Sequence, residues 1–262
     1  MAKESDKYSI KTIEKGFLIL DYISEQNHPV SLQEISDATQ LNNNMAFRLL
    51  VSLVNSGYVK KDNYANLYSI SLKSLKLSRN ALHSVEIRKI SMPYMEMLWS
   101  QYPKANINLA VYYQGEVLVI GRIDSQNLPR TYFTPGRVLP FHCSGLGKIL
   151  TCTLPEKEID ELISKGLKQY TVNTITDEKK LKENLLQVRA EMVGRDRNEF
   201  IAGDNCSAVP ILGKDGNIIA GLSLSALDNY MSEQEVENTI PKLKETAQRI
   251  SSTLGYNSGF SF

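Results

Sequence analysis

The chain of 262 residues has little of what marks secreted, membrane or disulfide-rich proteins. It contains three cysteines, an odd number that does not suit a disulfide framework, so a reducing cytoplasm is the expected compartment. No apolar run reaches about 18 residues, so no membrane span is expected. The first residues, MAKESDKYSI, are polar and lack the apolar core of a signal peptide. The composition, with 42% hydrophobic and 23% charged residues, is that of a soluble globular protein.

An excess of charge of one sign is also lacking. The formal net charge is +1, and residues 1–80 carry ten Lys or Arg against eight Asp or Glu. So weak a bias does not by itself indicate nucleic-acid binding. If the partner is DNA, a local surface must bind it, and dimerisation would double that surface.

Residues typical of catalytic and metal sites are scarce. The chain has three histidines, and His142 lies beside Cys143. These two residues and Cys152 do not have the spacing of zinc ligands, and a free cysteine is more often a small buried hydrophobe than a nucleophile. The run SGLGK lacks the first glycine of a phosphate-binding loop, because position 142 is histidine. We therefore expect no cofactor, no metal and no enzymatic activity.

Signals for three short helices open the chain. Apolar residues recur at helical spacing from Ile13 to Ile23. The run SLQE at 31–34 is a capping box, in which Ser31 caps a second helix and Glu34 reaches back to it. Asn42 is a good N-cap for a third helix, LNNNMAFRLLVSLVNSGYV, that ends at a glycine.

A predicted hairpin follows these helices. The run YVKKDNYANLYSI reads as two short strands around a polar turn from Asp62 to Asn66. Three short helices followed by a hairpin are typical of a winged helix-turn-helix domain, here over residues 1–71. The third helix would then enter a major groove, where asparagine can pair with adenine and arginine with guanine. The residues expected to contact DNA from this helix and the wing are Asn43, Asn44, Phe47, Arg48, Lys60 and Lys61.

The rest of the chain divides into a connecting segment and a second domain. Residues 72–101 are mostly helical and are expected to form linker helices. Residues 102–262 mix strands with helices, and the strongest hairpin signal is the turn at Asp215-Gly216. Paired hairpins with helices around them indicate an α+β domain with an antiparallel sheet.

The ordered motifs of both parts resemble the IclR family of bacterial transcription regulators. The resemblance is carried by IEKGFLILDYI, SLQEISDATQL and FRLLVSLVNSGYV in the first domain. In the second it is carried by GRVLPFHCSGLGKIL, DRNEFIAGDNCSAVPIL and DGNIIAGLSLSA. It implies a GAF-like effector-binding domain at 102–262, operator DNA as partner, and a homodimer or tetramer. Within the family, the chain looks most similar to the KdgR-type branch, which responds to sugar acids such as 2-keto-3-deoxygluconate.

Two runs in the second domain suggest an effector site. Ser144, Gly145 and Leu146 begin a helix, where free backbone N–H groups and the helix dipole favour an anion. Ser223 and Ser225 stand at i and i+2 of one strand and so share a sheet face.

The family resemblance adds Asp196 and Cys206 to the same cavity. A carboxylate accepts from hydroxyl groups but repels another carboxylate, so Asp196 favours a small hydroxylated or keto acid over a plain aromatic one.

These observations predict a ligand-responsive transcriptional regulator, in particular a repressor of a catabolic operon. Two alternatives stay open. The second domain could only dimerise and bind no ligand, or it could be a small-molecule hydrolase that uses Cys206. The hydrolase lacks a convincing base, because His28 lies in the first domain and His83 in the linker.

Overall fold

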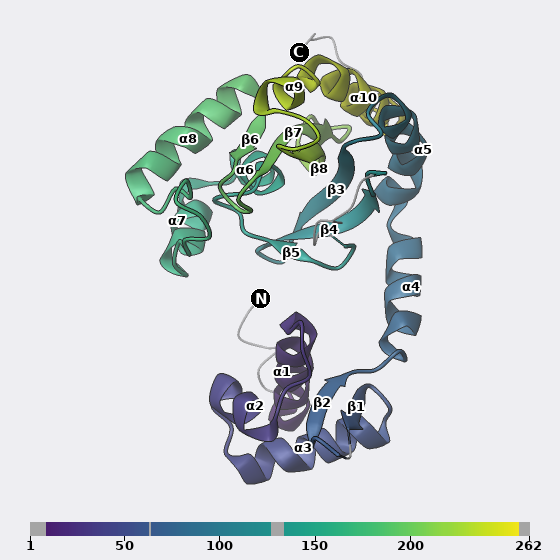
Figure 1. The fold of residues 1–262 in the computed structure, drawn as a ribbon, viewed down its shortest axis with the longest axis vertical. Helices are drawn as coiled ribbons and strands as arrows, with labels where there is room; N and C mark the ends of the chain where they lie inside the picture. The colour runs from purple at the N-terminus through teal and green to yellow at the C-terminus, as the bar shows by residue number, and fades with distance from the viewer. Residues whose placement is uncertain (1–8, 63, 127–133, 257–262) are drawn as a thin grey trace. The chain divides into compact units, whose positions relative to one another are not determined.

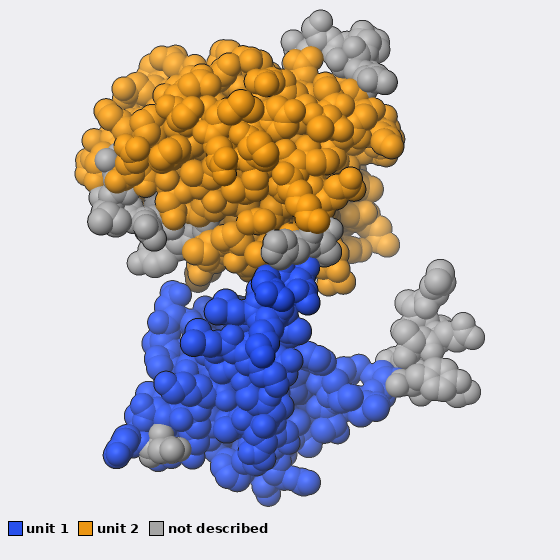
Figure 2. Space-filling model, turned by 90° about the vertical axis from the view of Figure 1, so that its right-hand side faces the viewer, with its two compact units in different colours: residues 1–81 blue, residues 82–262 orange. Residues whose placement is uncertain are grey.

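The computed structural model describes residues 9–62, 64–126 and 134–256. The chain forms two compact units, Met1–Ala81 and Leu82–Phe262, which are coloured separately in Figure 2. The boundary between them falls inside the segment 72–101 that we expected as a linker. Among the helices of the described ranges, none has both the length and the apolar character that crossing a membrane requires.

Unit 1 is the predicted winged helix-turn-helix domain (Figure 1). Its elements are listed in chain order: α1 Lys11–Glu25, α2 Leu32–Thr39, α3 Asn43–Asn55, β1 Val59–Asp62 and β2 Leu67–Ile70. The strands β1 and β2 pair antiparallel, and an isolated bridge joins Val30 to Tyr68. Apolar side chains from all three helices and from the hairpin form its core, including Ile19, Ile35 and Leu50.

The predicted helix caps of unit 1 are confirmed. The Ser31 hydroxyl accepts from the Glu34 amide at 3.2 Å, and the Glu34 carboxylate accepts from the Ser31 amide at 2.8 Å. The Asn42 side chain accepts from the Met45 amide at 2.9 Å and so begins α3. Each cap satisfies an N–H group that has no partner within its helix. Together they define the short turn between α2 and α3.

Two helices follow the hairpin, α4 (Ser74–Ser84) and α5 (Glu86–Gln101). The unit boundary lies within α4. The second helix, α5, is part of unit 2, because its Met95 and Leu98 are buried in the main core of that unit. Pro93 lies inside α5. There it removes one backbone N–H from the helix, which continues on both sides.

Unit 2 has the expected α+β fold with one antiparallel sheet, in the strand order β5-β4-β3-β8-β7-β6 (Figure 1). The strands are β3 Asn106–Tyr113, β4 Glu116–Ile123, β5 Val138–Leu139, β6 Gly194–Arg197, β7 Asp204–Leu212 and β8 Ile218–Leu227. The helices after α5 are α6 Gly145–Thr151, α7 Glu156–Ser164, α8 Glu178–Glu191, α9 Glu233–Glu237 and α10 Ile240–Thr253.

The two faces of this sheet differ in what covers them. On one face α5 and α10 pack against Val209, Leu222 and Leu224. On the other face α6 packs against Ala208 and neighbouring apolar residues, and α8 packs against α6. Ser223 and Ser225 alternate with the two leucines along β8, so they point to the α6 side.

Glycines allow α6 to lie directly on the sheet. A Cβ atom on Gly194 of β6 would collide with the carbonyl oxygen of Gly145, the first residue of α6. A Cβ on Gly145 would lie 3.1 Å from the Cys206 Sγ, and one on Gly147 would lie 2.6 Å from the Phe141 Cα. These glycines therefore allow chain segments to pack closely against one another.

Candidate effector cavity and DNA-facing helix

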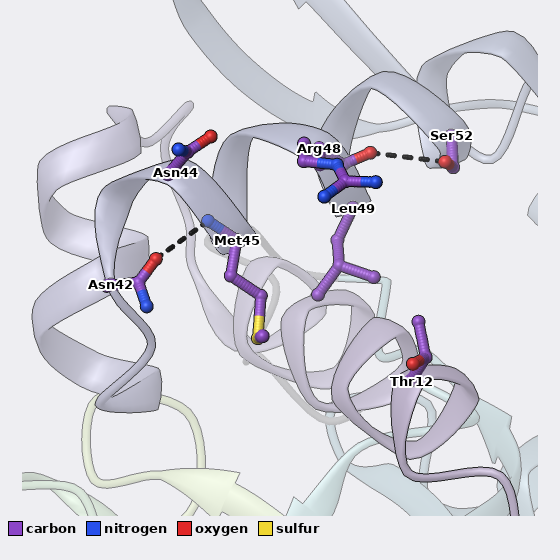
Figure 3. Close-up of a pocket in the computed structure, with 7 residues that line it drawn as sticks. All are labelled: Thr12, Asn42, Asn44, Met45, Arg48, Leu49 and Ser52. Atoms are coloured by element: carbon purple, nitrogen blue, oxygen red, sulfur yellow. Dashed lines mark hydrogen bonds between the residues drawn. The ribbon is translucent and has the colours of Figure 1, made fainter.

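The exposed side of α3 carries the residues predicted to contact DNA. Asn44 and Arg48 lie one helical turn apart and are exposed, opposite the buried Ala46 and Leu50. Figure 3 shows the hollow beside this stripe, with Thr12 on α1 and the other lining residues on or just before α3. The hollow has a volume of about 390 Å³. The third helix thus presents an amide and a guanidinium that the core does not use.

Two other α3 residues that were predicted to contact DNA, Asn43 and Phe47, differ in how far their side chains are restrained. The Asn43 side chain donates to the Gln33 Oε1 of α2 at 3.2 Å, which restrains its orientation. Phe47 is 46% exposed, so it is not a core residue. An exposed aromatic beside a polar stripe is available to contact sugar or base methyl groups.

The predicted wing lysines point to opposite sides of β1. Lys60 is exposed, whereas Lys61 is partly buried with its Nζ 5.8 Å from the centre of the Tyr68 ring. Lys60 is therefore the freer of the two to meet a phosphate. Tyr64 at the tip of the wing is fully exposed and was not among the predicted residues. Its place in the polar turn NYAN could have indicated it.

In unit 2 the structure brings all seven predicted effector-site residues to one small cavity, which Asn108 and Leu139 also line. They come from α6 or its cap and from β6, β7 and β8: Ser144, Gly145, Leu146, Asp196, Cys206, Ser223 and Ser225. The cavity encloses about 10 Å³, roughly the space that one water molecule needs. A ligand larger than water would require these walls to move apart.

The register of the sheet aligns polar side chains in two rows on the α6 side. The first row runs across four neighbouring strands, in the order Asp196 of β6, Cys206 of β7, Ser225 of β8 and Asn106 of β3. In the second row Ser223 pairs with Asn108, which pairs with Arg122. We call these seven residues the polar band. It crosses five strands of the sheet.

The end of the band on β3 and β4 was not predicted from the sequence. Arg122 is buried, and its guanidinium donates to Asn108 Oδ1 at 2.9 Å, to Asn106 Oδ1 at 2.8 Å and to Asp124 Oδ1 at 2.5 Å. Asn108 in turn donates to the Ser223 hydroxyl at 3.4 Å. Two asparagines at i and i+2 in the apolar run NINLAV were the available signal.

Asp196 has a structural role besides lining the cavity. It is 2% exposed, and its Oδ1 accepts from the Glu199 amide at 2.7 Å and from the Phe200 amide at 3.3 Å. Burial raises the pKa of Asp196 to about 8, against the opposing effect of these two hydrogen bonds. In this state Asp196 therefore closes the turn after β6 and is largely protonated at neutral pH.

A buried ion pair attaches α6 to the same turn. The Lys148 ammonium lies 2.5 Å from the Glu199 Oε1 and donates to the Arg195 carbonyl at 2.9 Å. Both side chains are buried. Because removing one partner would leave a buried charge unpaired, this pair strongly disfavours separating α6 from the turn.

Hydrogen-bonding groups at the start of α6 already have partners within the protein. The Ser144 hydroxyl accepts from the Gly147 amide at 3.0 Å and donates to the Pro140 carbonyl at 2.7 Å. The Gly145 amide faces the Cys206 thiol. Ser144 and Gly145 thus shape the cavity wall, and Leu146, at the second position of α6, has an amide without a helical partner.

The cysteines do not have the environment of nucleophiles. Burial raises the pKa of Cys206 and of Cys143, and it raises that of Cys152 to about 11. Burial lowers the pKa of His142, whose Nε2 lies 3.0 Å from the Lys168 carbonyl oxygen. Within the part of the chain that the structure describes, no His, Cys, Asp and Glu side chains form a group that could hold a metal ion.

Two family models match the chain. Residues 12–63 match the IclR helix-turn-helix domain, and residues 79–252 match the C-terminal domain of the bacterial transcriptional regulator IclR. Together these two matches include α1, α3, α6 and all six strands of the unit 2 sheet.

Curated relatives are similar over nearly the full chain. The HTH-type transcriptional regulator KdgR of Escherichia coli K12 is 30% identical over 95% of this chain and 94% of its own. The HTH-type transcriptional repressor AllR of Klebsiella pneumoniae is 28% identical over 94% of this chain and 90% of its own. Among solved structures, the IclR protein of Thermotoga maritima has a TM-score of 0.68 with 27% identity, covering 95% of this chain and 100% of that one.

The raised pKa of Asp196 predicts how stability depends on pH. As pH rises above about 4, the unfolded chain loses this proton, whereas the folded chain keeps it until about pH 8. The free energy of unfolding should therefore fall over this range, by up to about 1.4 kcal/mol per pH unit from this group. In Asp196→Asn the amide oxygen can still accept from Glu199 and Phe200, but the titration is removed.

We expect urea unfolding of wild type and Asp196→Asn at pH 5, 6.5 and 8 to show the variant gaining stability relative to wild type as pH rises. Stability curves that stay parallel over this range would contradict the assignment of a buried, largely protonated Asp196.

Proposed function

Because the chain belongs to the IclR family of bacterial transcriptional regulators, we propose that its DNA binding is controlled by a small hydroxylated or keto carboxylic acid held on the polar band. It is a DNA-binding transcriptional regulator rather than an enzyme, as its relatives are. The observation that carries the proposal is the meeting of seven sequence-predicted residues at one cavity over the polar face of the sheet.

For DNA, the proposal assigns base contacts to Asn44 and Arg48. Their side chains are exposed on the side of α3 opposite its buried residues. Asn43 and Phe47 flank them, and Lys60 and Lys61 of the wing would contact phosphates. One such module has little net charge, so we propose a homodimer or tetramer on a pseudo-palindromic operator.

For the effector, the proposal assigns a carboxylate to the start of α6 and hydroxyl groups to the band. Ser223 and Ser225 offer hydroxyls from β8. A hydrogen bond donated by a ligand hydroxyl would stabilise the ionised form of the Asp196 carboxyl. The Cys206 thiol would form a weakly polar wall. A sugar acid such as 2-keto-3-deoxygluconate has both the carboxylate and the hydroxyl groups.

The two alternatives fit the structure less well. A domain that only dimerises has no use for a polar band buried between α6 and the sheet, because burying polar groups there costs stability. A hydrolase that uses Cys206 would need a thiolate, and burial raises the pKa of this thiol. We propose a cytoplasmic repressor of a catabolic operon, released or retained on its operator by the acid.

The first prediction from this proposal concerns α3. Replacing both Asn44 and Arg48 by alanine should weaken specific operator binding by about ten-fold or more, because each lost bidentate base contact costs about 1–3 kcal/mol. Gel shifts on an operator fragment selected from random DNA would measure it. The control is Lys157→Ala, which removes one positive charge from a side chain of unit 2 that is 89% exposed.

The control should bind the operator like wild type, and circular dichroism should show that the double variant is folded. If the double variant binds the selected operator with wild-type affinity, this side of α3 does not face the bases.

The second prediction concerns the effector. At pH 8, where Asp196 can ionise, Asp196→Asn should lower affinity for the effector about ten-fold, since a hydrogen bond to a charged acceptor contributes about 1.5–3 kcal/mol. Ser223→Ala should have a smaller effect in the same direction. Calorimetry with 2-keto-3-deoxygluconate measures both effects. The control is Glu158→Gln, which removes a carboxylate from an exposed position on α7.

Operator binding without effector should survive in all three variants, because the DNA-contacting residues lie in unit 1. An unchanged dissociation constant for Asp196→Asn would mean that the acid binds elsewhere.

A further inference from the structure

One buried carboxyl in unit 2 has no hydrogen-bond partner. Asp204, the first residue of β7, is 1% exposed, and neither of its side-chain oxygens is hydrogen bonded. It stands two residues before Cys206 on the same strand and therefore points to the same face of the sheet as the polar band. Buried polar atoms are nearly always hydrogen bonded, so such an exception calls for an explanation.

A second unsatisfied group lies on the neighbouring strand. The Ser225 hydroxyl is also buried without a partner, although its residue pairs with both Cys206 and Asn106 in the sheet. Three buried oxygen atoms without partners thus lie on the face of the sheet that carries the polar band. One is the hydroxyl of Ser225, which lines the cavity, and the other two belong to Asp204, two residues along β7 from Cys206, which also lines it. A buried oxygen that the protein leaves unsatisfied is available to a ligand.

We propose that Asp204, beside the Ser225 hydroxyl of the effector cavity, forms a second subsite, which accepts hydrogen bonds from hydroxyl groups at the far end of a five- or six-carbon sugar acid. This inference rests on the proposed function, in which the carboxylate of the acid lies at the start of α6. It narrows the effector class, because it excludes two- and three-carbon keto acids as full ligands.

The length of the ligand follows from strand geometry. Residues i and i+2 of a strand lie roughly 7 Å apart, so Asp204 is about that far from Cys206, against which α6 begins. Carbon–carbon bonds of about 1.5 Å let a chain of five or six carbons span this distance. A three-carbon acid anchored at α6 would end near Cys206 and leave Asp204 unsatisfied.

The charges around Asp204 suit a hydroxyl donor rather than a second carboxylate. Burial raises the pKa of Asp204 to about 7, while the Arg122 guanidinium opposes this rise and Asp228 adds to it. Asp196 also faces the site, and its charge couples to that of Asp204. A hydrogen bond from a ligand hydroxyl favours the ionised form, so binding near pH 7 should release protons.

Calorimetry with three named acids tests the subsite. The probes are 2-keto-3-deoxygluconate and D-gluconate, with six carbons, and pyruvate, with three. Asp204→Val removes both acceptors while keeping a residue suited to a strand, and Asp204→Asn keeps one acceptor. The control is Glu158→Gln, which removes an exposed carboxylate of α7.

We expect Asp204→Val to bind at least one six-carbon acid ten-fold or more weakly than wild type, with Asp204→Asn intermediate and Glu158→Gln unchanged. Any binding of pyruvate should not respond to these variants. Repeating the wild-type titration in buffers of different ionisation enthalpy at pH 7 should show proton release with the six-carbon acid, and Asp204→Val should reduce it.

Unfolding without ligand supplies an independent readout. An unsatisfied carboxyl kept for a ligand destabilises the empty protein, so Asp204→Val should melt at a higher temperature than wild type at pH 8. A lower melting temperature would show that the carboxyl holds the fold together, and it would overturn the proposal.

The outcomes separate this inference from the proposed function. If the six-carbon acids bind and Asp196→Asn weakens them while Asp204→Val does not, the second subsite is wrong and the effector cavity stands. If none of the three acids binds wild-type protein, both are wrong.

Discussion

The proposed effector cavity depends on one close contact, in which the backbone of α6 lies directly against β6 and β7. Glycine at 194 is required, because a Cβ there would collide with the Gly145 carbonyl, and a Cβ on Gly145 would lie only 3.0 Å from the Gly194 carbonyl oxygen. The buried pair of Lys148 and Glu199 then fixes the helix to the turn that Asp196 closes. A helix held so close to the sheet covers the polar band and keeps it from water. That desolvation raises the pKa of Asp196 and strengthens every hydrogen bond that a ligand could make there.

A polar band buried in this way is costly unless it is satisfied. Much of it is satisfied internally, because Arg122 donates to both Asn106 and Asn108. Two groups on this face have no partner among the described residues: the hydroxyl of Ser225, which lines the cavity, and the carboxyl of Asp204, two residues along β7 from Cys206. Since the empty cavity has room for about one water molecule, binding an acid must be coupled to a change in the packing around it. Such coupling is what a ligand-responsive regulator requires.

The parts of the fold that could be predicted from the sequence are those with local causes. Caps at Ser31 and Asn42 identified the helices of unit 1, and strand alternation placed Ser223 and Ser225 on one face. The contribution of Arg122 could not be predicted, because its place in the band depends on how distant strands pair. Likewise the role of Asp196 in closing a turn depends on local backbone geometry that side-chain patterns do not reveal. The assignment of the effector residues rested on resemblance more than on spacing.

The central claim is that the acid and the operator influence one another through this protein. Linkage requires that if the acid changes operator affinity, the operator changes acid affinity by the same factor. The direct measurement is operator affinity by fluorescence anisotropy with and without saturating 2-keto-3-deoxygluconate, together with acid affinity with and without saturating operator. The account predicts equal changes of about five-fold or more in both. Operator affinity that stays the same while the acid is bound would contradict it.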